Sequence, residues 1–162
     1  MKKPFNIDSK IVTIEDLLQI KEERKNEQMV FSNGCFDILH VGHVRYLNEA
    51  RSFGDYLVIG LNSDRSVRQL KGPDRPINQQ DSRAVMLAAL AFVDYVVIFD
   101  EETPLVLIQQ LLPDILVKGS DYDPKDIVGG KEVIANGGKV VTVPLVEGFS
   151  STKIINKLKD QA

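Results

Sequence analysis

Hydrophobic residues gather in short runs of Val, Ile and Leu along this chain, and amphipathic segments separate the runs. From Met29 onward the runs predict buried strands at 29–31, 56–61, 95–99, 115–117 and 139–143. Apolar residues spaced three and four apart, together with N-cap residues and prolines, predict five helices. They cover 41–53, a short segment starting near 62–64, 80–90, the stretch from Pro104 to Pro113, and a C-terminal segment with Ile154, Ile155 and Leu158. Because the strands do not alternate apolar and polar residues, we expect helices on both faces of a doubly wound parallel α/β sheet.

The residues before the first predicted strand form a unit of their own. Thr13 followed by Asp16 is typical of a helix N-cap, and apolar Ile14, Leu17 and Ile20 follow before a charged run. We therefore expect an N-terminal helical extension over 1–28, with a surface helix, and a main domain over 29–162.

Composition narrows the classes of partner. A length of 162 residues suits one main domain, and a net charge of −3 argues against nucleic acid as a partner. The single cysteine, Cys35, excludes an intrachain disulfide and fits a reducing compartment. No stretch reaches the roughly 20 apolar residues of a membrane span, and no apolar leader opens the chain. We expect a cytoplasmic protein that binds neither membranes nor nucleic acid.

Both histidines of the chain, His40 and His43, follow the first predicted strand at the start of a helix. Their spacing of three places both rings on one face of a helical turn, and Gly42 between them lets a ligand approach the backbone. A helix N-terminus favours negative charge, so the motif predicts a phosphate site. The alternatives are two surface histidines, or a zinc site with Cys35, which lacks a fourth Cys or His ligand.

Other phosphate-binding loops are missing. Gly129-Gly130-Lys131 precedes Glu132 and lacks the first glycine of a P-loop, and no G-x-G-x-x-G follows the first strand. The sequence therefore supports neither a P-loop kinase nor a dinucleotide-dependent dehydrogenase.

The run from Asn33 to His43, NGCFDILHVGH, resembles the signature of the cytidylyltransferase-like nucleotidyltransferase superfamily. The nearest likeness is to the adenylyltransferase domains of bacterial enzymes that make ADP-glycero-manno-heptose, and it covers about residues 10–157. It includes Leu70-Lys71-Gly72, Leu116-Val117-Lys118-Gly119, Ala135-Asn136-Gly137-Gly138 and the loop 147–152. The resemblance implies a Rossmann-like sheet of nucleotidyltransferase type over 29–162. It also implies transfer of AMP from ATP to a heptose 1-phosphate, yielding ADP-heptose and pyrophosphate for lipopolysaccharide or other surface polysaccharides.

Residue roles also follow from the resemblance. Its catalytic positions are His40 and His43, which stabilise the α-phosphate, and Lys71, which reaches the phosphates from a loop. The nucleotide-binding positions are Phe36, Asp37, Gly42, Arg83, Lys118, Asp121, Ser151 and Thr152. We assign Asn62, Asp64 and Arg75 to the sugar phosphate.

Simpler roles stay open for several of these residues. Arg83 could form an exposed ion pair on a helix, Asp121 could be a turn residue, and Arg75 could be a solvated loop charge. Ser151 and Thr152 could only cap a helix. Cys35 is expected to be a small buried hydrophobe rather than a nucleophile.

The nucleotide preference rests on one departure from the glycerol-phosphate cytidylyltransferases. These enzymes carry an Arg-Thr pair where this chain has Leu145 and Val146, which favours ATP over CTP. A cytidylyltransferase acting on glycerol 3-phosphate or another alcohol phosphate remains the alternative, and a non-catalytic nucleotide sensor is the alternative of another class. We expect Mg²⁺ to accompany ATP. A separate sugar kinase is expected to supply the sugar 1-phosphate, and a homo-oligomer is left open.

Overall fold

The computed structural model describes residues 4–120, 126–144 and 148–159. Its centre is a parallel sheet with the strand order β3-β2-β1-β4-β5. The strands span Met29–Gly34 (β1), Tyr56–Asn62 (β2), Tyr95–Phe99 (β3), Ile115–Gly119 (β4) and Lys139–Val143 (β5). This arrangement confirms the predicted Rossmann-like doubly wound sheet.

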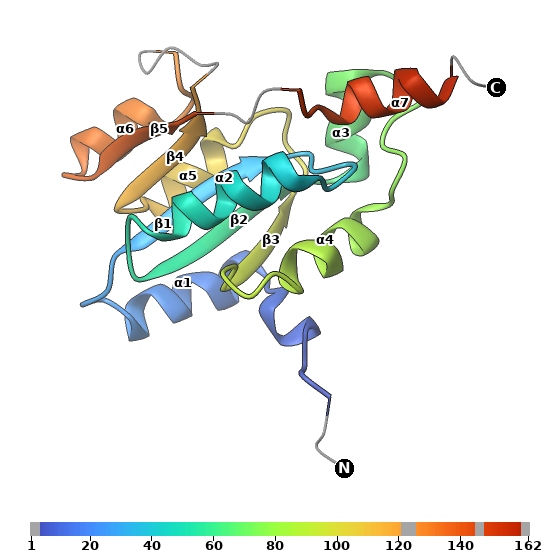
Figure 1. The fold of residues 1–162 in the computed structure, drawn as a ribbon. Coiled ribbons are helices and arrows are strands. Elements are labelled where there is room, and N and C mark those ends of the chain that lie inside the picture. Colours follow the sequence, from blue (N-terminus) through green and yellow to red (C-terminus); the bar gives the residue numbers. More distant parts are fainter. Residues whose placement is uncertain (1–3, 121–125, 145–147, 160–162) are drawn as a thin grey trace.

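Helices cover both faces of the sheet (Figure 1). They span Asp8–Lys10 (η1, a 3-10 turn), Ile14–Glu23 (α1), Val41–Arg51 (α2), Asp64–Lys71 (α3), Gln80–Ala88 (α4), Leu105–Leu111 (α5), Gly130–Ala135 (α6) and Ser151–Lys159 (α7). Helix α6 has no counterpart among the predicted helices. No helix among the described residues is long and apolar enough to cross a membrane.

The core has two layers, one on each face. Side chains of α2 and α4, such as Leu47 and Leu87, pack with Val30 and Ile59 on one face. Side chains of α1, α5 and α6 pack on the other face with Phe31, Val58 and Leu116. In Figure 1, α2 lies in front of the sheet and α5 behind it. Both faces are therefore buried, as the lack of polar alternation in the strands predicts.

The N-terminal segment shares this core. Leu17 of α1 is fully buried, and the Val12 amide donates to the Val96 carbonyl in β3 at 2.9 Å. Lys21 donates to the carbonyl oxygens of Leu111 and Leu112 at 2.5 and 2.8 Å. The predicted cap is present, since Thr13 and Asp16 form a capping box. The segment over 1–28, predicted as an extension, thus packs on the sheet through its described residues.

The sheet opens between β1 and β4 at their carboxyl ends. Strand β1 pairs with β2 along its whole length, up to Gly34 opposite Leu61, but its register with β4 covers only Val30 and Phe31. Tyr46 of α2 bridges the opening: its hydroxyl donates to the Val117 carbonyl at 3.0 Å and lies 2.8 Å from Ser32 Oγ. Strand order reverses at this point, where ligands bind in doubly wound sheets.

Candidate active site

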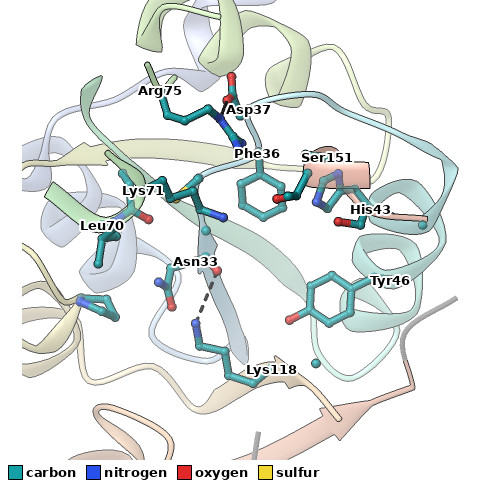
Figure 2. A pocket seen from close by; sticks show the side chains of 18 of the residues that line it. Asn33, Phe36, Asp37, His43, Tyr46, Leu70, Lys71, Arg75, Lys118 and Ser151 are labelled. Carbon is teal, nitrogen blue, oxygen red and sulfur yellow. Dashed lines mark hydrogen bonds and ion pairs between the residues drawn. The ribbon is translucent and has the colours of Figure 1, made fainter. Parts of the chain in front are cut away.

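A cavity of about 670 Å³ lies at the carboxyl ends of the strands, where the sheet opens. Figure 2 shows His43 and Ser151 on one side of this cavity, Leu70 and Lys71 on the opposite side, and Asn33 between them. The structure brings most of the predicted site residues to its wall: Phe36, Asp37, His40, Gly42, His43, Asn62, Lys71, Arg75, Lys118, Ser151 and Thr152.

The two histidines form a stacked pair at the start of α2. His40 is the N-cap residue and His43 lies in the first turn, and their ring centroids are 3.8 Å apart with planes inclined by 21°. A Cβ on Gly42 would lie 3.0 Å from Cε1 and Nδ1 of His40 and 3.2 Å from the Cβ of Phe149. A glycine at this position therefore allows the His40 ring to pack closely against the start of α2.

Burial favours the neutral form of both imidazoles in the free protein. Burial lowers the pKa of His43 to about 4, with smaller contributions from the neighbouring His40 and Lys71. Burial also lowers the pKa of His40. The Nδ1 atoms of both rings are buried and lack a hydrogen-bond partner among the described residues. Unpaired buried polar atoms of this kind cost free energy.

Metal binding by the histidines with Cys35 finds no support in the described part of the chain. There, no group of His, Cys, Asp and Glu side chains is placed to hold a metal ion. Cys35 is half-buried in the wall of the cavity rather than in the core, where we expected it. Burial raises the pKa of its thiol, against the opposing charges of Lys71, Arg83 and Arg75, so it is a poor nucleophile at neutral pH.

Asp37 anchors the loop that follows Lys71. Its side chain is only 1% exposed and accepts hydrogen bonds from Arg75 Nε at 2.6 Å and from the amides of Ile77 and Asn78 at 2.8 and 3.0 Å. Burial alone would raise the pKa of Asp37, but these amide and guanidinium partners hold it below its ordinary value. Arg75 is thus a buried ion-pair partner, and the alternative of a solvated loop charge is wrong.

Arg83 lies behind the cavity and does not line it. The residue is 2% exposed. Its guanidinium donates to the carbonyls of Cys35 (2.6 Å), Asn62 (2.8 Å) and Asn78 (2.9 Å) and pairs with Asp64 at 2.8 Å. The alternative of an exposed helix ion pair is therefore wrong, and the structure brings neither Arg83 nor Asp64 to the cavity wall. These contacts tie the ends of β1 and β2 to α3 and α4.

The remaining predicted cations and hydroxyls surround the opening of the sheet. Lys71 is the exposed last residue of α3, directly before Gly72, whose φ is 95°. Lys118 Nζ lies 3.4 Å from the Asn33 carbonyl across the opening. Ser151, at the start of α7, donates to the Ile38 carbonyl at 3.0 Å. Asp121, Leu145 and Val146 lie outside the described residues.

Comparison with known proteins decides the family. Residues 31–157 match the family model described as cytidylyltransferase-like. The chain belongs to the cytidylyltransferase-like family. This confirms the predicted resemblance, since the matched residues include the whole histidine motif.

Relatives of this cytidylyltransferase-like chain include proteins named "Bifunctional protein HldE". The one from Campylobacter fetus is 55% identical over 157 residues, which are 97% of this chain and 33% of that protein. The one from Syntrophotalea carbinolica is 54% identical, over 95% of this chain and 32% of its own length. The chain thus spans about a third of the length of these relatives.

Solved structures share the fold. A lipopolysaccharide core biosynthesis protein from Thermoplasma volcanium is 30% identical, with a TM-score of 0.61 over 74% of this chain and 97% of that one. Pantothenate synthetase from Thermus thermophilus has a TM-score of 0.65 at 19% identity, over 94% of this chain and 70% of its own. The second likeness concerns the fold alone.

Several cavity residues of this family member were missed by sequence reasoning. They include Asn33, whose Oδ1 is buried without a partner among the described residues, and Glu102, Thr103 and Asp126. Glu102 and Thr103 closely follow β3, so their place at a strand end was a usable signal. Asn33 opens the signature run from 33 to 43, but we assigned it no role in the site.

Proposed function

We propose that this chain transfers AMP from ATP to a heptose 1-phosphate, forming ADP-heptose and pyrophosphate for lipopolysaccharide or a related surface polysaccharide. The stacked pair of His40 and His43 in a cavity that also holds Lys71 and Lys118 carries the proposal. Family membership and the HldE proteins support it, as does a solved relative named for lipopolysaccharide core biosynthesis.

The reaction needs positioning and charge stabilisation more than a base. A sugar phosphate is largely dianionic near neutral pH, because its second pKa is about 6. One of its oxygens forms a bond to the α-phosphorus of ATP, and the bond from that phosphorus to the bridging oxygen of the β-phosphate breaks. Pyrophosphate leaves with the electron pair, so no protein nucleophile takes part.

The chain's own residues supply the charge stabilisation. Neutral His40 and His43 donate N–H groups to the oxygens of the α-phosphate, where charge builds up in the transition state. Lys71 approaches from the opposite side of the cavity (Figure 2), so the phosphorus lies between donors and a cation. The start of α7, with Ser151 and Thr152 in the cavity wall, offers free amides for the β- and γ-phosphates.

Mg²⁺ enters this proposal only with ATP. Since the described residues hold no group of side chains placed for a metal ion, we assign no protein ligand and no step to it. Mg²⁺ commonly binds through substrate phosphates and water, and it would add positive charge to the triphosphate. The sugar 1-phosphate itself would come from a sugar kinase.

The test is a matrix of nucleotides and acceptors, with pyrophosphate release as the readout. ATP, CTP and GTP are each paired with heptose 1-phosphate and glycerol 3-phosphate. We expect turnover to be highest with ATP and heptose 1-phosphate. Faster turnover with CTP and glycerol 3-phosphate would instead support the cytidylyltransferase alternative, and nucleotide binding without pyrophosphate release would indicate a sensor.

A further inference from the structure

The cavity extends over both faces of the sheet, and only one side holds the histidine pair. His40 and His43 belong to α2, and Phe36 beside them packs in the core under α2 and α4. The other side is formed by Glu102, Thr103 and Pro104 before α5 and by residues 126–128 before α6. Ile127 packs there with Leu107 and Ile108 in the opposite core layer. The proposed phosphate chemistry assigns no role to the residues of this second side.

The loop that carries Glu102 is held in place from α3. Ser66 Oγ donates to the Glu101 carbonyl at 2.7 Å, and the Ser63 amide donates to the Phe99 carbonyl at 2.9 Å. Asp100 accepts a hydrogen bond from Ser63 Oγ and pairs with Arg65 at 2.5 Å. Because these contacts hold the residues directly before Glu102, this part of the loop needs little reorganisation to meet a ligand.

Carboxylates lie on the α5 and α6 side of the cavity, where Glu102 and Asp126 carry negative charge. Lys71 of α3 and Lys118 of β4 also line the cavity and suit phosphates, whereas the charge of Arg75 is paired with Asp37. A carboxylate repels a phosphate but accepts hydrogen bonds from hydroxyl groups. The second side therefore suits the uncharged, hydroxyl-rich part of a ligand.

The geometry of phosphoryl transfer indicates which ligand this is. The attacking and leaving oxygens lie roughly in line across the phosphorus. The start of α7 lies beside His43 (Figure 2), so if pyrophosphate leaves toward it, the acceptor approaches from the other side of the cavity, where Glu102 and Thr103 lie. Building on the proposed function, we infer that Glu102, together with Thr103, binds hydroxyl groups of the acceptor sugar and sets specificity for a polyhydroxy acceptor.

The sign of the effect tests this assignment. If Glu102 contributed only its charge, Glu102→Ala would strengthen binding of both anionic substrates by removing repulsion. If it binds sugar hydroxyls, Glu102→Ala raises KM for heptose 1-phosphate about tenfold or more, because hydrogen bonds to charged groups are worth at least that factor. The Kd of ATP, measured by calorimetry, stays the same. Glu102→Gln keeps an acceptor oxygen and gives a smaller rise.

Glu101→Gln is the matched control, since Glu101 precedes Glu102, carries the same charge, is exposed and does not line the cavity. It should leave KM for the sugar phosphate within about twofold of wild type, as expected for a screened surface charge. An unchanged or lower KM in Glu102→Ala, with wild-type turnover and melting temperature, overturns the assignment but not the proposed function. Failure of the wild-type chain to use any sugar phosphate overturns both.

Discussion

Replacing Arg83 with methionine should cost the domain much of its stability while leaving the wall of the cavity in place. Arg83→Met keeps most of the side-chain length but removes every donor of the guanidinium. Asp64 then loses its partner, and the carbonyls of Cys35, Asn62 and Asn78 lose a donor. Breaking one side of a buried ion pair costs about 3–5 kcal/mol. For a chain of this length that corresponds to a fall of roughly 6–20 °C in melting temperature.

Thermal and urea unfolding measure this loss, and Arg65→Met is the matched control. Arg65 also pairs with an aspartate, Asp100, but the two side chains are 65% and 52% exposed, so the cost should stay below about 1 kcal/mol. ATP affinity, measured by calorimetry below the melting temperature, should change little in Arg83→Met. A melting temperature within about 2 °C of wild type, together with a markedly weaker ATP Kd, would refute this reasoning. It would show that Arg83 reaches the nucleotide, as the family resemblance implies.

Further predictions concern the cavity itself. His40→Ala and His43→Ala should each lower kcat by about 10²–10³ with little change in ATP Kd. In the double variant the loss of transition-state stabilisation should be smaller than the sum of the two single losses. A near-wild-type kcat with a large rise in the Kd of ATP would contradict a role in the transition state. Lys71→Ala should lower kcat strongly without changing the melting temperature, because the residue is exposed, and unchanged kinetics would make it a solvated charge. The lowered pKa of Asp37 means that its contribution to stability is present above its ordinary value of about 3.9 and is lost as pH falls through the folded-state pKa. In urea titrations between about pH 2.5 and 6, Asp37→Asn should therefore lose less stability on acidification than wild type. If the free energy of unfolding falls with pH in the same way in both proteins, the ion pair with Arg75 is contradicted.

The strands could be predicted from the sequence because their apolar runs are continuous. The predicted limits of β3 and β5, 95–99 and 139–143, agree with the structure. Strand β1 was predicted to end at Phe31 but continues to Gly34, because Ser32, Asn33 and Gly34 pair with residues of β2. Such pairing depends on a strand more than 20 residues away, which local polarity does not report.

Helix α6 was missed for a similar reason. Gly129 and Gly130 weaken any local helix signal, yet Gly129 is required where it stands, since a Cβ would come within 2.6 Å of Ile108. Packing against α5 and β5 overrides the weak local propensity. Tertiary contacts of this kind cannot be predicted from a short stretch of sequence.

The residues of the candidate site also differ in how far the sequence predicts them. The histidine motif could be placed because it follows a predicted strand at the start of a helix, whereas Lys71 and Ser151 were assigned through the family resemblance. Lys71, expected in a loop, is the last residue of α3. The pairing of Asp37 with Arg75 joins residues 38 positions apart, and Arg83 bonds to Cys35 across 48 positions. Spacing along the chain cannot report these contacts, so Arg83 was expected at the ligand and is found behind it.

The most direct test of the account follows the phosphorus atoms of ATP in the presence of heptose 1-phosphate. Phosphorus NMR of the reaction with the wild-type chain, with His43→Ala run in parallel, identifies every product. We predict ADP-heptose and pyrophosphate in equal amounts from the wild-type chain, and formation slowed by about 10²–10³ in His43→Ala. ADP with a doubly phosphorylated sugar, or equal rates from both proteins, would contradict nucleotidyl transfer at the stacked histidines.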